Sequence, residues 1–217
     1  MCKRPMRLLP SDWTFVKFYF GQHGEDAVFM SLLNWKKQAH GFYVDIGAYH
    51  PIDLSNTHAL YRQGWRGLTI DPNPGKEALF KRHRPNGIHL TCAVGEKEGQ
   101  AIYYQFPIET INTMDPERAE VLKKDFPCKE TVVQVRTLAS ILKEHWPDGK
   151  PINLLSVDCE TADESVLRSN DWNNYKPQWV LVEDGNLSGE TGIVRLLHEA
   201  GYSMAAAIYI TKLFKLN

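Results

Sequence analysis

Residues 41–51, GFYVDIGAYHP, contain the pattern that decides the fold. Phe42 begins an apolar run that predicts a buried strand ending at Ile46, with an acid, Asp45, inside it. Gly47 and Ala48 then form a turn, and glycine at such a turn lets the backbone approach a ligand closely. A strand followed by this turn is typical of the first strand-to-helix connection in nucleotide-binding α/β domains.

A second predicted strand, residues 68–70, ends in another acid, Asp71. An acid at the end of the second strand of such folds hydrogen-bonds a ribose, and its two oxygens could accept both hydroxyl groups. Alternatively, Asp71 only begins the turn at Pro72, since Asp-Pro is a common turn dipeptide.

The composition indicates a single globular domain, residues 1–217, in which residues 1–40 form an N-terminal extension and helix beside the ligand site. A formal charge of -1 gives no reason to expect a nucleic-acid partner. The chain lacks the run of ~18 apolar residues that a membrane helix needs, and no signal peptide is apparent, which favours a cytoplasmic protein. The four cysteines form no CxxC pair, so we expect no metal site.

Predicted strands and helices alternate along the chain. Helices are expected at 24–37, 57–63 with Ser55 as N-cap, 76–83, 116–124, 138–145, 164–168 and 191–200. Strands are expected at 42–46, 68–70, 88–94, 101–106, 132–135, 152–157, 180–182 and twice within 202–216. The alternation predicts a three-layer, Rossmann-like α/β fold with a mostly parallel sheet and an antiparallel C-terminal strand pair.

Acids follow or end four of these strands: Asp45, Asp71, Asp158 and Glu183. Ligands of open α/β sheets bind at the carboxyl ends of the strands. The sequence therefore predicts a ligand site at this edge of the sheet.

Several segments resemble the FkbM family of S-adenosylmethionine (SAM)-dependent methyltransferases. They are GQHGEDAVF (21–29), GFYVDIGAYHPIDLSNTHALYRQGWRGLTIDPNP (41–74), CAVGEKEG (92–99), LLSVDCETADESVLRSNDW (154–172) and WVLVE (179–183). The resemblance implies a seven-stranded class I fold and methyl transfer, often to an oxygen. One departure is Thr161, where the family usually has glycine; if this position needs a positive φ, threonine would strain it by ~1–3 kcal/mol.

The resemblance also implies where SAM would bind. Its methionine end would lie at the glycine turn and its ribose at Asp71. The residues expected around the cofactor are Gln22, Asp26, Asp45, Gly47, Ala48, Asn56, Asp71, Pro72, Asn73, Ala93, Val94 and Asp158.

For catalysis, paired carboxylates at a strand end make Asp158 and Glu160 the best candidates, because they can orient a hydroxyl or accept its proton. Asp158 could instead hold the amino group of SAM or cap the next helix. His50 is the most plausible imidazole base, although a lone histidine is more often structural. A Mg²⁺ ion on Asp158, Glu160 and Glu183 is conceivable but not required.

The leading hypothesis is a SAM-dependent O-methyltransferase that acts on a hydroxyl of a sugar or secondary metabolite, a small-molecule or glycan acceptor. A different class remains open: a catalytically inactive SAM-binding module or partner subunit, suggested by Thr161. An NAD-linked enzyme is a second alternative, although Asp45–Ala48 lacks a full GxGxxG. The sequence leaves the acceptor and the oligomeric state open.

Overall fold

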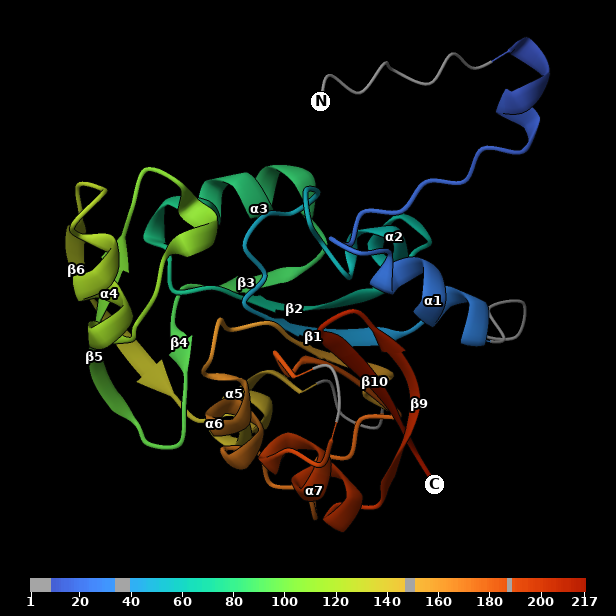
Figure 1. The fold of residues 1–217 in the computed structure, drawn as a ribbon. Helices are drawn as coiled ribbons and strands as arrows, with labels where there is room; N and C mark the ends of the chain where they lie inside the picture. The colour runs from blue at the N-terminus through green and yellow to red at the C-terminus, as the bar shows by residue number, and fades with distance from the viewer. Residues whose placement is uncertain (1–8, 34–39, 147–150, 187–188) are drawn as a thin grey trace.

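A seven-stranded sheet forms the centre of the computed structural model, which describes residues 9–33, 40–146, 151–186 and 189–217 (Figure 1). In spatial order its strands are β3 (Ile88–Leu90), β2 (Arg66–Ile70), β1 (Phe42–Ile46), β7 (Leu154–Val157), β8 (Trp179–Glu183), β10 (Thr211–Leu216) and β9 (Tyr202–Ile208). The first five are parallel, and β10 is antiparallel to both of its neighbours. The predicted fold class and the antiparallel C-terminal pair are thus confirmed.

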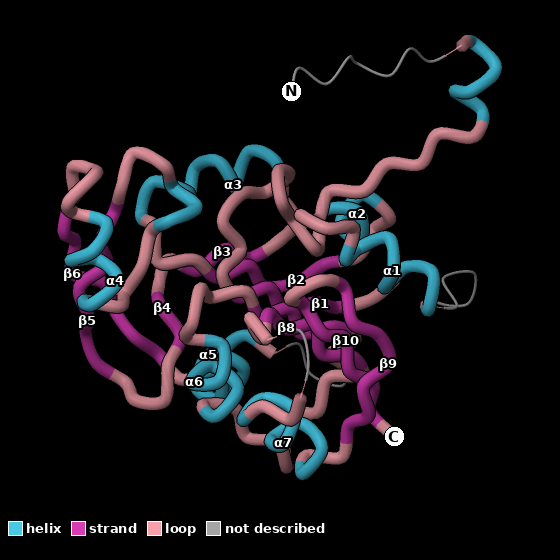
Figure 2. The backbone as a smooth tube through the Cα atoms, viewed as in Figure 1, coloured by secondary structure: helices cyan, strands magenta, loops and turns pink. Residues whose placement is uncertain are grey.

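Helices cover both faces of this sheet (Figures 1 and 2). One face carries α1 (Glu25–Leu32), α2 (His58–Arg62) and α3 (Glu77–His83), and the other carries α5 (Leu138–His145), α6 (Asp163–Arg168) and α7 (Gly192–Glu199). None of the helices in the described part of the chain is long and apolar enough to span a membrane.

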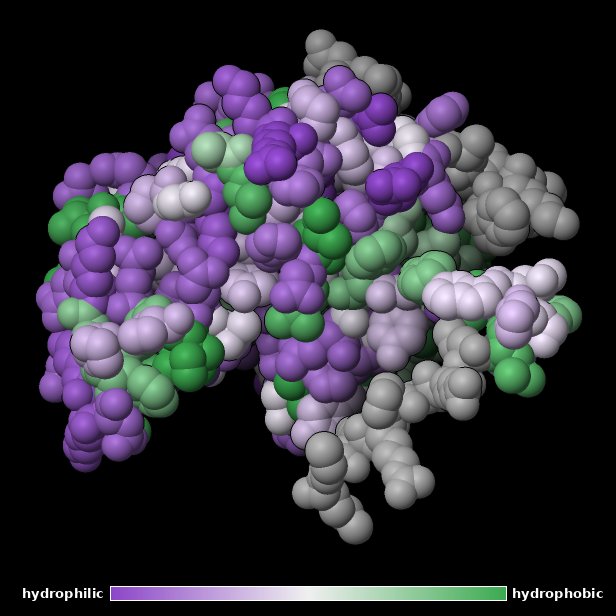
Figure 3. Space-filling model, turned by 90° about the horizontal axis from the view of Figure 1, so that it is seen from above, coloured by the Kyte–Doolittle hydropathy of each residue, from purple (hydrophilic) through white to green (hydrophobic). Residues whose placement is uncertain are grey.

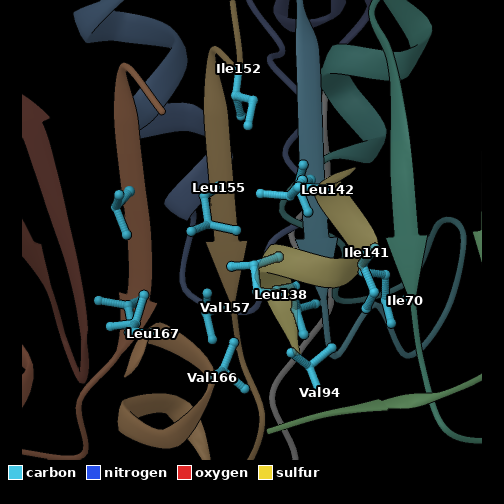
Figure 4. Packing of buried hydrophobic residues seen from close by; sticks show 14 of the residues in the cluster. Ile70, Val94, Leu138, Ile141, Leu142, Ile152, Leu155, Val157, Val166 and Leu167 are labelled. Atoms are coloured by element: carbon cyan, nitrogen blue, oxygen red, sulfur yellow. The ribbon is translucent and has the colours of Figure 1, made fainter. Parts of the chain in front are cut away.

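Alternation along the buried strands assigns side chains to the two faces. Val44 and Ile46 of β1 belong to the core beneath α5, α6 and α7, which Figure 4 shows around Leu155 and Val157. Tyr43 points to the opposite face, where it shares a cluster with Phe29 and Trp65. Trp65 is therefore a core residue.

A second, three-stranded sheet was not predicted. It has the order β4 (Ala93–Val94), β6 (Lys129–Arg136) and β5 (Gly99–Gln105), with β5 antiparallel to β6. The expected strand 88–94 is wrong as one unit, because β3 stays in the main sheet while β4 pairs with β6. The short helices η3 (Glu109–Ile111) and α4 (Pro116–Leu122) accompany this small sheet, which lies on the left in Figure 1.

Three local expectations also need correction. Ser55 is not the N-cap of α2, because Thr57 takes that position and makes no side-chain cap hydrogen bond. The helix expected at 24–37 ends at Leu32, and residues 34–39 lie outside the described residues. The helix expected at 76–83 begins as a short 3-10 turn, η2 (Pro74–Lys76), before α3.

The described N-terminal residues that include the 3-10 turn η1 (Pro10–Thr14) project from the body (Figure 1). Their aromatic side chains Trp13, Phe15 and Phe18 are 60–81% exposed. Elsewhere on the face shown in Figure 3, hydrophilic residues predominate and hydrophobic ones form small patches.

Candidate functional site

A cavity of about 450 Å³ opens where the carboxyl ends of the central strands meet the small sheet. This volume is within the range of ~300–1,000 Å³ typical of small-molecule sites. The described residues that line it are Gln22, Ile46, Gly47, Tyr49, Leu54, Ile70, Asp71, Pro72, Cys92, Ala93, Val94, Tyr103, Glu109, Thr110, Ile111, Asn112, Thr113, Met114, Arg118, Asp158, Cys159 and Glu160.

The glycine turn at Gly47 packs directly on the end of β7. Gly47 has a φ of 76°, and a Cβ placed on it would lie 1.7 Å from the carbonyl oxygen of Asp158. Its N–H donates to the Ile70 carbonyl at 2.9 Å, as does that of Ala48 at 3.1 Å. Glycine is therefore required by both backbone conformation and space, and the turn brings β1, β2 and β7 together at the cavity.

Asp71 lies at the end of β2 and is 7% exposed. Its Oδ2 accepts the Tyr49 N–H at 2.9 Å and its Oδ1 accepts the Asn73 N–H at 2.8 Å. Burial raises the pKa of this carboxyl, although the two backbone donors act in the opposite direction. Each oxygen retains an accepting direction, so the turn-forming role and the predicted ribose role are compatible.

The apolar part of the cavity comes from β4 and the residue before it. Cys92, Ala93 and Val94 are all at most 5% exposed and lie beside Pro72 in the cavity wall. This strip of small apolar side chains has the character expected of an adenine pocket. Asn73, by contrast, turns its side chain to the Gly75 N–H and to Gln105.

Asp158 and Glu160 border the cavity at the end of β7, as predicted. Burial raises the pKa of Asp158 well above its usual range, and a hydrogen bond with the Glu183 carboxyl raises it further. Asp158 therefore favours its protonated form, which can donate to an oxygen of the Glu183 carboxyl group. Glu160 Oε2 accepts from Arg118 Nη1 at 2.7 Å, so a cation from α4 holds the second predicted acid.

Thr161 has a φ of 89°, and Glu160 before it has a φ of 50°. Position 161 thus has a positive φ, and threonine occupies a backbone conformation that favours glycine. Because Glu160 lines the cavity, this strained stretch of backbone lies at the cavity rim and sets the direction of the Glu160 side chain.

Asp45 faces away from the described lining residues. Its carboxylate accepts from Thr57 Oγ1 and Ser156, and burial raises its pKa despite the nearby guanidinium of Arg84. Asn56 Nδ2 also reaches Ser156 Oγ, at 3.4 Å. Alternation explains this placement, because Asp45 is on the same face of β1 as Tyr43. For Asp45, Ala48 and Asn56, direct cofactor contact stays a prediction.

Gln22 and Asp26 have different positions. Gln22 lines the cavity, whereas Asp26 is 1% exposed and accepts hydrogen bonds from the backbone N–H groups of Phe20, Gly21 and Ala27. Asp26 thus holds the segment that carries Gln22 over the cavity. Its own contact with a cofactor stays a prediction.

His50 is outside the described cavity lining. Its Nδ1 accepts the N–H groups of Ile52 at 3.2 Å and Asp53 at 2.9 Å, which uses that nitrogen within the loop. Burial, together with Lys76, lowers the pKa of the imidazole. These contacts give His50 a structural role in the loop, and its role as a base stays a prediction.

Other cavity residues were missed by the sequence analysis. Residues 109–114 and Arg118 come from a stretch without clear periodicity, and Tyr49 follows the glycine turn. Lys76 Nζ lies 4.7 Å from the centre of the Tyr49 ring and pairs with Glu109, which ties the two walls together. Within the described ranges, no group of three His, Cys, Asp or Glu side chains is arranged to hold a metal ion.

Comparisons with known proteins agree with the sequence resemblance. A family model described as the methyltransferase FkbM domain matches residues 45–204. Methyltransferase sdnD from Sordaria araneosa is 35% identical over 80 residues, which cover 33% of this chain and 31% of sdnD. The chain thus matches about a third of the length of this curated relative.

Among solved structures, a TehB-like SAM-dependent methyltransferase from Corynebacterium glutamicum aligns over 95% of this chain and 93% of its own. The TM-score is 0.43 and the identity 9%. At these values the likeness supports no functional argument.

Proposed function

This chain belongs to the FkbM methyltransferase family, and we propose that it transfers a methyl group from SAM to a hydroxyl of a small-molecule or glycan acceptor. One observation carries the proposal: Gly47, Asp71, Val94 and Asp158, which are far apart in the sequence, line a single cavity of about 450 Å³.

The proposed cofactor orientation follows from the polarity of the cavity wall. Asp71 offers two carboxylate oxygens for ribose hydroxyls, and the apolar strip at Ala93 and Val94 flanks the adenine. Gly47 lets the methionine part of SAM pass close to the backbone, toward Gln22. When bound, SAM supplies a methyl group on a positively charged sulfur.

Asp158 and Glu183 would receive the acceptor hydroxyl. A protonated Asp158 can donate a hydrogen bond to the acceptor hydroxyl, and a neighbouring carboxyl oxygen can accept one from it, which would fix the direction of the hydroxyl oxygen. Carboxylates are weak bases toward an alcohol, so we assign most of the rate to alignment of that oxygen with the methyl group. Arg118 fixes Glu160 beside the same site.

The first test is calorimetric titration of the protein with S-adenosylhomocysteine (SAH), supported by mass spectrometry of any ligand retained through purification. We expect binding, and Asp71→Asn should weaken it about tenfold because one oxygen acceptor becomes a donor. Asp125→Asn on the surface is the matched control. A well-folded protein that binds neither SAM nor SAH would refute the proposal.

Turnover is tested with labelled SAM and a panel of glycosides, phenols and aliphatic alcohols. Asp158→Asn should lower methyl transfer far more than SAH affinity. Binding of SAM with no methylated product across the panel would instead support the non-catalytic SAM-binding alternative, and retained nicotinamide would support the NAD-linked one.

A further inference from the structure

Arg84 is a cation in the interior of the protein, at the carboxyl end of α3. It is 2% exposed and is outside the described residues that line the cavity. Burying a guanidinium is unfavourable unless its donors are satisfied. Its partners therefore indicate what the buried charge does.

All five N–H donors of Arg84 have acceptors. Nε and Nη2 donate to the Pro51 carbonyl at 3.0 and 2.7 Å, and Nη2 also donates to Ser55 Oγ at 2.7 Å. Nη1 donates to Thr57 Oγ1 at 2.8 Å and to the Tyr43 hydroxyl at 3.3 Å. Three of these four partners belong to the single loop that joins β1 to α2.

The same loop forms part of the cavity wall through Tyr49 and Leu54. These two residues have φ values of 46° and 52°, which non-glycine residues rarely adopt. Such conformations persist only when surrounding contacts hold them. Arg84 binds the loop at Pro51, between the two strained residues, and at Ser55, directly after the second.

Thr57 extends this arrangement to β1. Its hydroxyl accepts from Arg84 and donates to Asp45, so the buried cation and the buried carboxylate are joined through one oxygen. Asp45 thus anchors the chain of contacts that ends at Arg84, and its contact with the cofactor stays a prediction.

We propose that Arg84 is a positioning residue, which fixes the 49–57 loop in the conformation that completes the cofactor cavity without touching the cofactor itself. The proposal rests on the function proposed above. Lysine cannot replace it fully, since an ammonium has three donors and lacks the planar fork.

The test is the SAH dissociation constant of Arg84→Met, Arg84→Lys and Ser55→Ala, measured at a temperature where circular dichroism shows each to be folded. Arg84→Met should weaken binding at least about tenfold, or ~1.4 kcal/mol. Arg84→Lys should recover part of this loss, and Ser55→Ala should weaken binding by about threefold, since only one of the five contacts is lost. Ser55→Ala keeps the test decisive if the methionine variant does not fold.

Two controls separate positioning from general destabilisation. Arg82→Met removes an exposed arginine from the same helix, and Leu197→Ala opens a cavity in the core beneath α7. Both should bind SAH as the wild type does, although Leu197→Ala should unfold at a lower temperature. If the Arg84→Lys and Ser55→Ala proteins fold and bind SAH with wild-type affinity, the positioning role of Arg84 is refuted and the proposed function stands. If the wild type does not bind SAH, both the proposed function and the positioning role are refuted.

Discussion

Replacing Gly47 with alanine should separate the two strand ends that meet at the cavity. A left-handed φ costs an alanine about 1–2 kcal/mol relative to glycine, and overpacking against the Asp158 carbonyl, 1.7 Å from the added Cβ, costs about 1–3 kcal/mol more. The smaller entropy of the unfolded alanine chain offsets about 0.4–1 kcal/mol. We expect a net loss of about 3 kcal/mol, which lowers the unfolding midpoint by roughly 6–12 °C for a chain of this size.

The assay is thermal and urea unfolding followed by near- and far-ultraviolet circular dichroism, whose agreement checks two-state behaviour. Gly185→Ala is the matched control, because Gly185 also has a positive φ, 60°, but an added Cβ meets nothing within 4 Å. Gly99→Ala, with open space and no positive φ, gives the baseline. If Gly47→Ala unfolds at the same midpoint as Gly185→Ala, the close contact with Asp158 has no energetic weight and the reasoning fails.

Three further predictions concern groups near the strand ends. Thr161→Gly should stabilise the protein by about 0.5–1 kcal/mol, because it relieves a φ of 89°; an unchanged or lower urea midpoint would contradict this. Burial raises the pKa of Asp163 to about 6, so its contribution to wild-type stability should fall by up to about 3 kcal/mol as pH rises from about 4 through 6. Burial also raises the pKa of other carboxyl groups, so urea titrations of Asp163→Asn should show a fall that is smaller by this amount, and an equal fall in both proteins would contradict the assignment. Lys212→Met should lower the free energy of unfolding by about 3–5 kcal/mol, because it leaves Asp184 buried without its cation. In a double-mutant cycle, adding Asp184→Leu should recover most of this loss, and additive losses would refute the explanation.

Much of the main sheet could be predicted because its strands are short apolar runs bounded by clear turns. The two-residue strand β4 could not, since no glycine or proline divides the run 88–94, and only pairing with distant Val135 and Arg136 removes Ala93 and Val94 from the main sheet. Such long-range pairing leaves no local pattern in the sequence.

The position of a residue in the cavity wall was predicted where a strand end alone determines it, as at Asp71 and Asp158. It was not predicted where tertiary packing determines position. Arg118 lies on a short helix in an irregular stretch, and Arg84 has meaning only through the loop that it holds. For Asp45, the period-two alternation of β1 indicates the face opposite Val44, whereas the expected contact with the cofactor rests on the family resemblance and stays a prediction.

The position of β4 between two hydrophobic cores has a thermodynamic consequence. Val94 belongs to the main core and its neighbour Ala93 to the small cluster with Tyr103 and Val133, and both residues line the cavity. A ligand in the cavity touches both cores, so its binding free energy is linked to the local opening of the small sheet. Amide hydrogen exchange in β5 and β6 should therefore slow with ligand concentration, even though these strands supply few of the contacts.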